Sequence, residues 1–136
     1  MIGTGRALLA LLVLSLTACA LIAPYDRITD ERLTELHATV VALLEQLPGA
    51  SYELARPGLG AVRRELGTLR LRQQARPRSG LMIAQVDTII RTWDRLEALV
   101  KLGPLSLAEV DLIRRTLDVE FRSALAAEID KGRLLP

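Results

Sequence analysis

The stretch Met82–Val100, MIAQVDTIIRTWDRLEALV, decides the fold of this 136-residue chain. Its apolar residues recur in steps of three and four, which places them on one face of an α-helix: Met82, Val86, Ile89, Trp93, Leu96 and Val100, flanked by Ile83, Ile90 and Leu99. Gly103-Pro104 follows and is typical of a helix C-terminus. The stretch therefore predicts a helix whose apolar face must pack against other helices.

Two segments before this stretch carry the same spacing. The first predicts a helix from about residue 30 to residue 47, with Thr29 or Asp30 as its cap, Pro48-Gly49 as its stop, and an apolar stripe of Leu33, Leu36, Val40, Leu43 and Leu47. The second starts at Pro57 and ends before Arg76-Pro77, with Leu59, Val62, Leu66 and Leu69. Its glycines weaken it, and residues 51–56 are expected to form a separate helical turn.

The last segment begins with a capping box, in which Ser106 and Glu109 bond to each other's backbone amides. The helix is expected to end near Gly132, with an inward stripe of Val110, Ile113, Leu117, Phe121 and Leu125. Its outer face has opposite charges at helical spacing, in the pairs Asp111–Arg115, Arg114–Asp118 and Asp118–Arg122.

Four amphipathic segments with short connections and no strand-like alternation predict an all-α fold. We expect an antiparallel up-down-up-down four-helix bundle over residues 27–136, with three helices plus a broken second helix as the alternative. A core of this size fits one domain.

The N-terminal residues have the features of an export signal. Arg6 precedes the apolar run Ala7–Leu16, which is too short to span a bilayer. The run ends in Leu16-Thr17-Ala18-Cys19, which resembles the lipobox of bacterial lipoproteins. The alternative is an ordinary signal peptide or signal anchor with an incidental cysteine.

The resemblance implies that residues 1–18 are a signal peptide cleaved after Ala18. Cys19 would then carry a diacylglyceryl group and an acylated amine such as a palmitoyl amide, with residues 19–26 as the lipidated cysteine and a short tether. In this family an aspartate after the cysteine commonly retains the protein in the inner membrane. Ala20 stands there, so the resemblance implies the periplasmic face of the outer membrane rather than the inner membrane.

A second, shorter resemblance follows the cysteine. The stretch Tyr25-Asp26-Arg27-Ile28-Thr29-Asp30 is similar to the start of the mature part in small, uncharacterised helical lipoproteins of proteobacteria. It implies the anchor and the helices, and no activity.

Groups that could carry catalysis or bind a cofactor are scarce. His37 is the only histidine and lies beside the stripe of its helix, where a structural role at the core boundary is expected. Cys19 is the only cysteine, which excludes an intramolecular disulfide and a thiolate metal site. The acidic series Asp26, Asp30, Glu31 and Glu35 lacks calcium-loop spacing. We therefore predict no catalytic residue, no metal and no cofactor.

Charge is nearly balanced overall, at +2, but the first two helices differ in sign. Residues 25–47 are mainly acidic, whereas residues 56–78 hold seven arginines against Glu65. One interpretation is that the two helices pair through salt bridges at their rim. The other is that arginines contact an anionic surface, either phospholipid or an acidic protein: Arg56, Arg63, Arg64, Arg70 and Arg72.

These observations favour a non-enzymatic structural or interaction module held at the membrane by its lipid, with a protein partner in the periplasm. The alternative is a carrier or sensor of an apolar small molecule in the bundle core. Nucleic acid is not an expected partner, because an aromatic content of 3% provides no stacking platform. The oligomeric state does not follow from the sequence.

Overall fold

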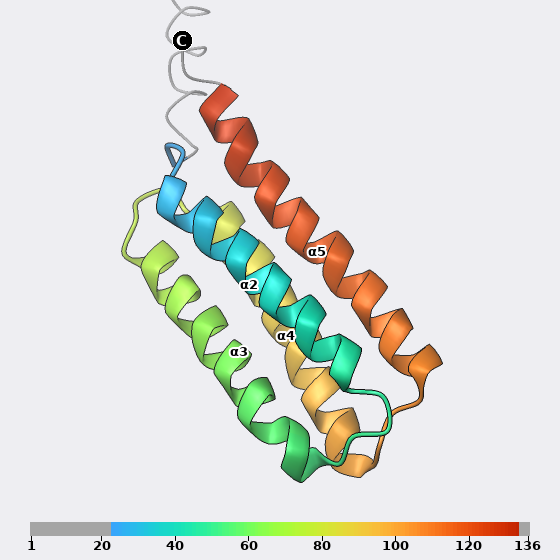
Figure 1. Ribbon diagram of the computed structural model, residues 1–136. Coiled ribbons are helices and arrows are strands. Elements are labelled where there is room, and N and C mark those ends of the chain that lie inside the picture. The colour runs from blue at the N-terminus through green and yellow to red at the C-terminus, as the bar shows by residue number, and fades with distance from the viewer. Residues whose placement is uncertain (1–22, 134–136) are drawn as a thin grey trace, which may run out of the picture.

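The computed structural model describes residues 23–133, which form an antiparallel four-helix bundle (Figure 1). Its helices are α2 (Arg27–Gln46), α3 (Tyr52–Gln74), α4 (Gly80–Leu102) and α5 (Leu107–Arg133). Each helix packs against two neighbours, so that the contacts run α2 to α3, α3 to α4, α4 to α5 and α5 back to α2. The predicted all-α bundle is confirmed, and the described residues include no strand.

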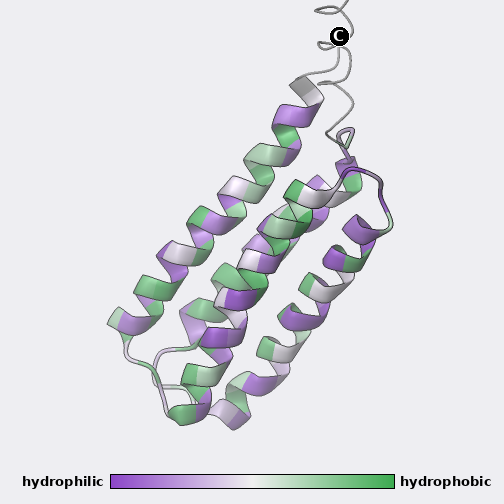
Figure 2. Cartoon of the chain, turned by 180° about the vertical axis from the view of Figure 1, so that it is seen from behind, coloured by the Kyte–Doolittle hydropathy of each residue, from purple (hydrophilic) through white to green (hydrophobic). Residues whose placement is uncertain are grey.

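The core lies along the axis of the bundle and contains the predicted stripes. Trp93 and Phe121 are its largest buried side chains, and both are fully enclosed. The indole Nε1 of Trp93 donates a hydrogen bond to the backbone carbonyl of Leu59, 3.0 Å away, which satisfies the one polar atom of this side chain. Leu43, Ile113 and Leu125 are only partly buried and pack against the edge of the core. Figure 2 shows hydrophilic and hydrophobic residues alternating along the helices, as expected when one face of each is buried.

α3 is one continuous helix, so the predicted separate turn over residues 51–56 was wrong. Ser51 caps the helix, and its hydroxyl accepts a hydrogen bond from the amide of Leu54 at 3.4 Å. Pro57 lies inside the helix and is exposed, whereas Ala55 and Leu59 on either side are buried. Burial of that stripe outweighs the one backbone hydrogen bond that proline cannot make. The alternative with a broken second helix is therefore not adopted.

α2 also begins earlier than expected. Its N-cap is Asp26 rather than Thr29 or Asp30, and its first helical residue is Arg27. Thr29 is instead fully buried in the first turn. The helix ends at Gln46, with Leu47 as its C-cap, in agreement with the predicted stop at Pro48-Gly49. Gly49 has a φ of 73°, a conformation that favours glycine.

α5 begins with the predicted capping box. The amide of Glu109 donates to Ser106 Oγ at 3.3 Å, and the amide of Ser106 donates to Glu109 Oε2 at 2.7 Å. Of the three charge pairs predicted on α5, Asp111–Arg115 is confirmed and the two that involve Asp118 were wrong. Asp111 pairs with both Arg114 and Arg115, whereas Asp118 turns toward α2 and pairs with neither Arg114 nor Arg122.

None of the helices in the range 23–133 is both long enough and apolar enough to cross a membrane.

Candidate functional site at the tether end of the bundle

The residues that precede α2 are packed against the body of the bundle. The amide of Ala23 donates to the carbonyl of Arg78 at 3.2 Å, and Arg76 Nη2 donates to the carbonyl of Pro24 at 2.9 Å. Ala23 is buried. We call this region the tether end: Ala23–Asp26, the connection 75–79 and the last turns of α5. In Figure 1 it lies at the top, where α2 begins.

Asp26 is the centre of the tether end. Its carboxylate caps α2 by accepting from the amide of Ile28 at 3.2 Å, and it accepts from Thr29 Oγ1 at 2.6 Å. Arg72 donates to both carboxylate oxygens at 2.9 to 3.1 Å, and Arg76 Nη1 lies 3.0 Å from Oδ2. Asp26 therefore joins the start of α2 to the last turns of α3.

These contacts also set the charge of Asp26. Burial alone would raise the pKa of its carboxyl group, but the hydrogen bonds from Thr29 and Arg72 and the positive charges of Arg76 and Arg72 together outweigh burial. The pKa is therefore held below its usual value. Asp26 remains ionised at neutral pH.

A second layer of polar side chains lies beneath Asp26. Gln73 Nε2 donates to Thr29 Oγ1 at 2.6 Å, and both residues are fully buried. From α5, Glu128 accepts from the backbone amide of Asp26 at 2.6 Å and from Lys131 Nζ at 2.8 Å. The Glu128 side chain has no exposed surface, and that of Lys131 is only 4% exposed. The start of the described chain is thus tied to α3 and α5 together.

Sequence reasoning did not identify the buried members of this network, although the helical spacing contains them. Gln73 continues the stripe of Leu59, Val62, Leu66 and Leu69, and Glu128 and Lys131 continue that of Leu117, Phe121 and Ala124. A polar residue at a core position normally requires a buried partner. That rule could have indicated a polar layer at this end of the bundle.

The five arginines predicted to contact an anionic surface fall into two groups. Arg63 pairs with Asp94 at 2.7 Å, Arg70 with Asp87 at 2.5 Å, and Arg72 with Asp26. Arg56 and Arg64 are exposed and form no ion pair with any described residue. The acids that balance α3 therefore come largely from α4, and the ion pair between Arg32 on α2 and Glu65 on α3 is long, at 3.8 Å. An anionic-surface role for the arginines stays a prediction.

His37 lies at the boundary of the core on the seam between α2 and α5. Its Nε2 is 2.7 Å from Asp118 Oδ1, and its ring stacks on Phe121 with centroids 4.9 Å apart. The side chain is 20% exposed. The predicted boundary position is confirmed, with contacts that connect α2 to α5.

The acidic series at the start of α2 does not converge on one point. Asp30 accepts from the hydroxyl of Tyr25 at 2.9 Å, Glu31 pairs with Arg27, and Asp26 faces α3. Over the described range, no three histidine, cysteine, aspartate or glutamate side chains are grouped so as to hold a metal ion.

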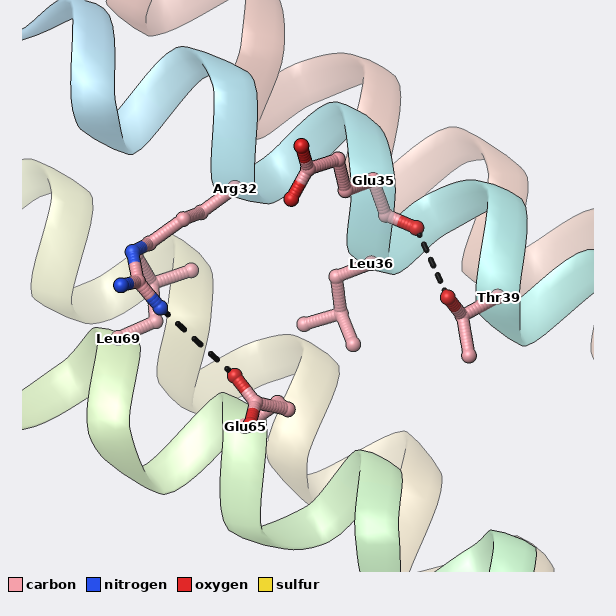
Figure 3. Close-up of a pocket in the computed structure, with 6 residues that line it drawn as sticks. All are labelled: Arg32, Glu35, Leu36, Thr39, Glu65 and Leu69. Atoms are coloured by element: carbon pink, nitrogen blue, oxygen red, sulfur yellow. Dashed lines mark hydrogen bonds and ion pairs between the residues drawn. The ribbon is translucent and has the colours of Figure 1, made fainter.

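A shallow hollow of about 190 Å³ lies between α2 and α3 (Figure 3). Leu36 and Leu69 provide apolar walls, and the ion pair of Arg32 with Glu65 crosses the seam beside them. A second hollow of about 170 Å³ lies on the same seam near Leu43 and Leu54. Both are smaller than the roughly 300 to 1,000 Å³ of ordinary ligand pockets.

The predicted lipidation residue, Cys19, and the signal peptide over residues 1–18 lie outside the described residues. Comparison of the chain with protein families, with curated proteins and with solved structures found no match.

Proposed function

We propose that this chain is a lipoprotein, anchored through Cys19 to the periplasmic face of the outer membrane, and that its bundle is a non-enzymatic structural or interaction module. The lipid would determine where the bundle sits, and the helix faces that the membrane leaves free would contact a protein partner. The lipobox resemblance of Leu16–Cys19 supports the anchor.

The packing of residues 23–26 carries this proposal furthest. Hydrogen bonds attach this segment to α3 and α5, so that only residues 20–22 separate Cys19 from the body of the bundle. Four Cα-to-Cα steps at about 3.5 Å each give a maximum reach of about 14 Å. A lipid on Cys19 would therefore hold the tether end directly at the headgroups. Two or more acyl chains are needed for stable attachment.

The alternative of an apolar carrier has no specific observation in its favour. Trp93 and Phe121 fill the centre of the core, and the two hollows on the seam between α2 and α3 are small. At the tether end, Asp26, Glu128 and Lys131 are engaged with one another or with neighbouring helices, and the buried Gln73 Oε1 and Ser79 Oγ have no hydrogen-bond partner among the described residues.

Intact-mass analysis and membrane fractionation of the protein in a Gram-negative host test the anchor. The wild type is expected to begin at an acylated Cys19 and to fractionate with the outer membrane. Cys19→Ala should abolish acylation and release the bundle from the membrane. Ala20→Asp is the matched control, because it keeps the lipid and is expected from the resemblance to shift the protein to the inner membrane. A bare thiol on Cys19, or a leader still attached, would refute the proposal.

A further inference from the structure

The outer face of α4 is apolar and basic. Leu81, Leu99 and Leu102 are 55%, 43% and 87% exposed, and they lie along one side of the helix with the exposed residues Arg91 and Arg95 between them. Neither arginine forms an ion pair within the described part of the chain. Arg91 donates only to the hydroxyl of Thr88 on its own helix.

The outer face of α5 continues this surface. Leu112 and Val119 lie one heptad apart and are 68% and 65% exposed. The hydrogen bond from Thr92 Oγ1 to Glu120 Oε1, at 2.7 Å, joins the two helices one residue away from Arg91 and Val119. The two stripes therefore lie side by side and form one surface, the α4/α5 face: Leu81, Arg91, Arg95, Leu99, Leu102, Leu112 and Val119. Figure 2 views the bundle from the side on which α4 lies in front.

Five acids of these helices are engaged away from the α4/α5 face or at its edge. Asp87 and Asp94 reach the arginines of α3, and Asp118 reaches His37 of α2. Glu120 is bonded to Thr92 in the seam, and Glu109 is held in the capping box at the far end. Arg91 and Arg95 both act electrostatically on Glu120, so two positive charges face a single carboxylate and the middle of the face stays net basic. Basic side chains among exposed leucines are complementary to an apolar layer topped by negative charge.

One end of the α4/α5 face lies next to Ala23, the described residue nearest to Cys19 in sequence. Leu81 lies in the first turn of α4, directly after the α3–α4 connection. In that connection, the carbonyl of Arg78 accepts a hydrogen bond from the amide of Ala23. From there to Leu102 the helix rises by about 31 Å at 1.5 Å per residue. A lipid attached at the tether end would therefore bring one end of this face to the membrane surface.

We propose that the α4/α5 face lies against an anionic phospholipid leaflet, so that the anchored bundle rests on its side. This inference rests on the proposed lipid anchor. The leucines enter the headgroup region, and Arg91 and Arg95 bind lipid phosphates. The opposite side of the bundle, formed by α2 and α3, then faces the periplasm and remains open to a protein partner.

Acylation of Cys19 makes a sharp test available, because it consumes the chain's only thiol. A cysteine introduced at residue 102 or at residue 46 is then the only site for a fluorescent thiol label. Both positions are exposed and lie at the end away from the anchor, where Gly49 on the α2–α3 connection donates to the carbonyl of Leu105 on the α4–α5 connection. They lie on diagonal helices, so that only residue 102 belongs to the α4/α5 face.

The acylated Leu102→Cys and Gln46→Cys proteins are reconstituted into vesicles of phosphatidylcholine and phosphatidylglycerol that contain brominated lipids. The proposal expects lipid quenching of the label at residue 102 and none at residue 46. An upright bundle would leave both labels unquenched, and a bundle lying on α2 would quench only residue 46. Either of these results would overturn the proposal.

A charge series tests the arginines. Arg91→Gln with Arg95→Gln should reduce quenching at residue 102 by at least ~2-fold, as should vesicles of phosphatidylcholine alone. Arg56→Gln with Arg64→Gln is the matched control, because these α3 arginines are also exposed and unpaired among the described residues. Equal losses in the two double variants would contradict the proposal.

Two further results separate the possible failures. If acylated protein does not float with vesicles, the anchor itself is refuted. If it floats while residue 102 stays unquenched, and a photocrosslinker there captures an acidic protein in cells, the face binds protein and the lipid proposal is overturned.

Discussion

Asp26 and Arg72 are 46 residues apart in sequence and form a two-pronged ion pair, with Arg72 Nη2 within 3.1 Å of both carboxylate oxygens and Nε 3.1 Å from Oδ2. The Asp26 side chain is only 11% exposed, so solvent screens the pair less than it screens a surface salt bridge. The same carboxylate caps α2. The Asp26 side chain therefore sets both where α2 starts and where the start of α2 is joined to α3.

Replacing Asp26 should lower stability strongly for a residue outside the apolar core. We expect Asp26→Ala to reduce the free energy of unfolding by about 2 to 4 kcal/mol, because it removes a helix cap and leaves two arginines without their partner. Asp26→Asn should cost less, since asparagine also caps helices. Urea unfolding measures both. Asp30→Asn is the control from the same turn, expected within about 0.5 kcal/mol of the wild type, because the asparagine oxygen can still accept the hydrogen bond from Tyr25. Equal stability of Asp26→Ala and Asp30→Asn would contradict the role of Asp26.

The lowered pKa of Asp26 predicts a specific loss of stability in acid. Because the pKa of the folded state lies below that of the unfolded state, the stabilisation is fully present above the unfolded value of about 3.9 and is lost as the pH falls through the folded value. The difference in unfolding free energy between wild type and Asp26→Asn should therefore shrink below about pH 4. A difference that stays constant down to about pH 2 would show that the carboxylate charge contributes nothing.

Trp93 should be the most costly core position to truncate. Trp93→Ala is expected to lower the free energy of unfolding by roughly 3 to 5 kcal/mol, because the side chain is fully buried and its removal leaves a cavity. Trp93→Phe keeps much of the volume but loses the hydrogen bond to Leu59, so its cost should be smaller. A negligible shift of the unfolding midpoint for Trp93→Ala would rule out this packing.

The glycines of α3 allow a matched comparison of helix propensity and crowding. Gly60→Ala should stabilise the protein by about 0.5 to 1 kcal/mol, because the new methyl group meets nothing closer than Arg64 Nη1 at 3.5 Å. Gly58→Ala should gain less, since its methyl group would lie 2.7 Å from Leu43 Cδ1 and that side chain would have to move. Thermal unfolding ranks the two variants. A larger gain for Gly58→Ala would show that α2 and α3 do not approach closely there.

Local signals were enough to predict most of the fold. The stripes of α4 and α5, the stop at Gly103-Pro104 and the Ser106–Glu109 capping box each depend on residues within a few positions of one another, and all are confirmed. The failures involve distant residues. Asp26 replaces Thr29 and Asp30 as the cap because Arg72, Arg76 and Glu128 hold it in place, and no local pattern contains those partners.

The contacts of the candidate site were also hard to predict from the sequence, because they join residues that are distant along the chain. The excess of arginines on α3 is plain in the sequence and suggested a free basic surface. Two of these arginines instead form ion pairs with Asp87 and Asp94, which lie on α4. Likewise, Asp118 is spaced to pair along α5 yet binds His37 across the seam. The spacing of charges along one helix identifies the ion pairs that are possible within that helix. Tertiary packing decides whether a side chain forms such a pair or one with another helix.

The hydrogen bond from the Asp26 amide to Glu128 has a mechanical consequence. A pull on the N-terminal segment would reach Asp26 before it reached any turn of α2, and Asp26 would pass the load sideways to Arg72 on α3 and to Glu128 on α5. Traction would then be shared by three helices in parallel, instead of peeling one helix off the bundle from its end.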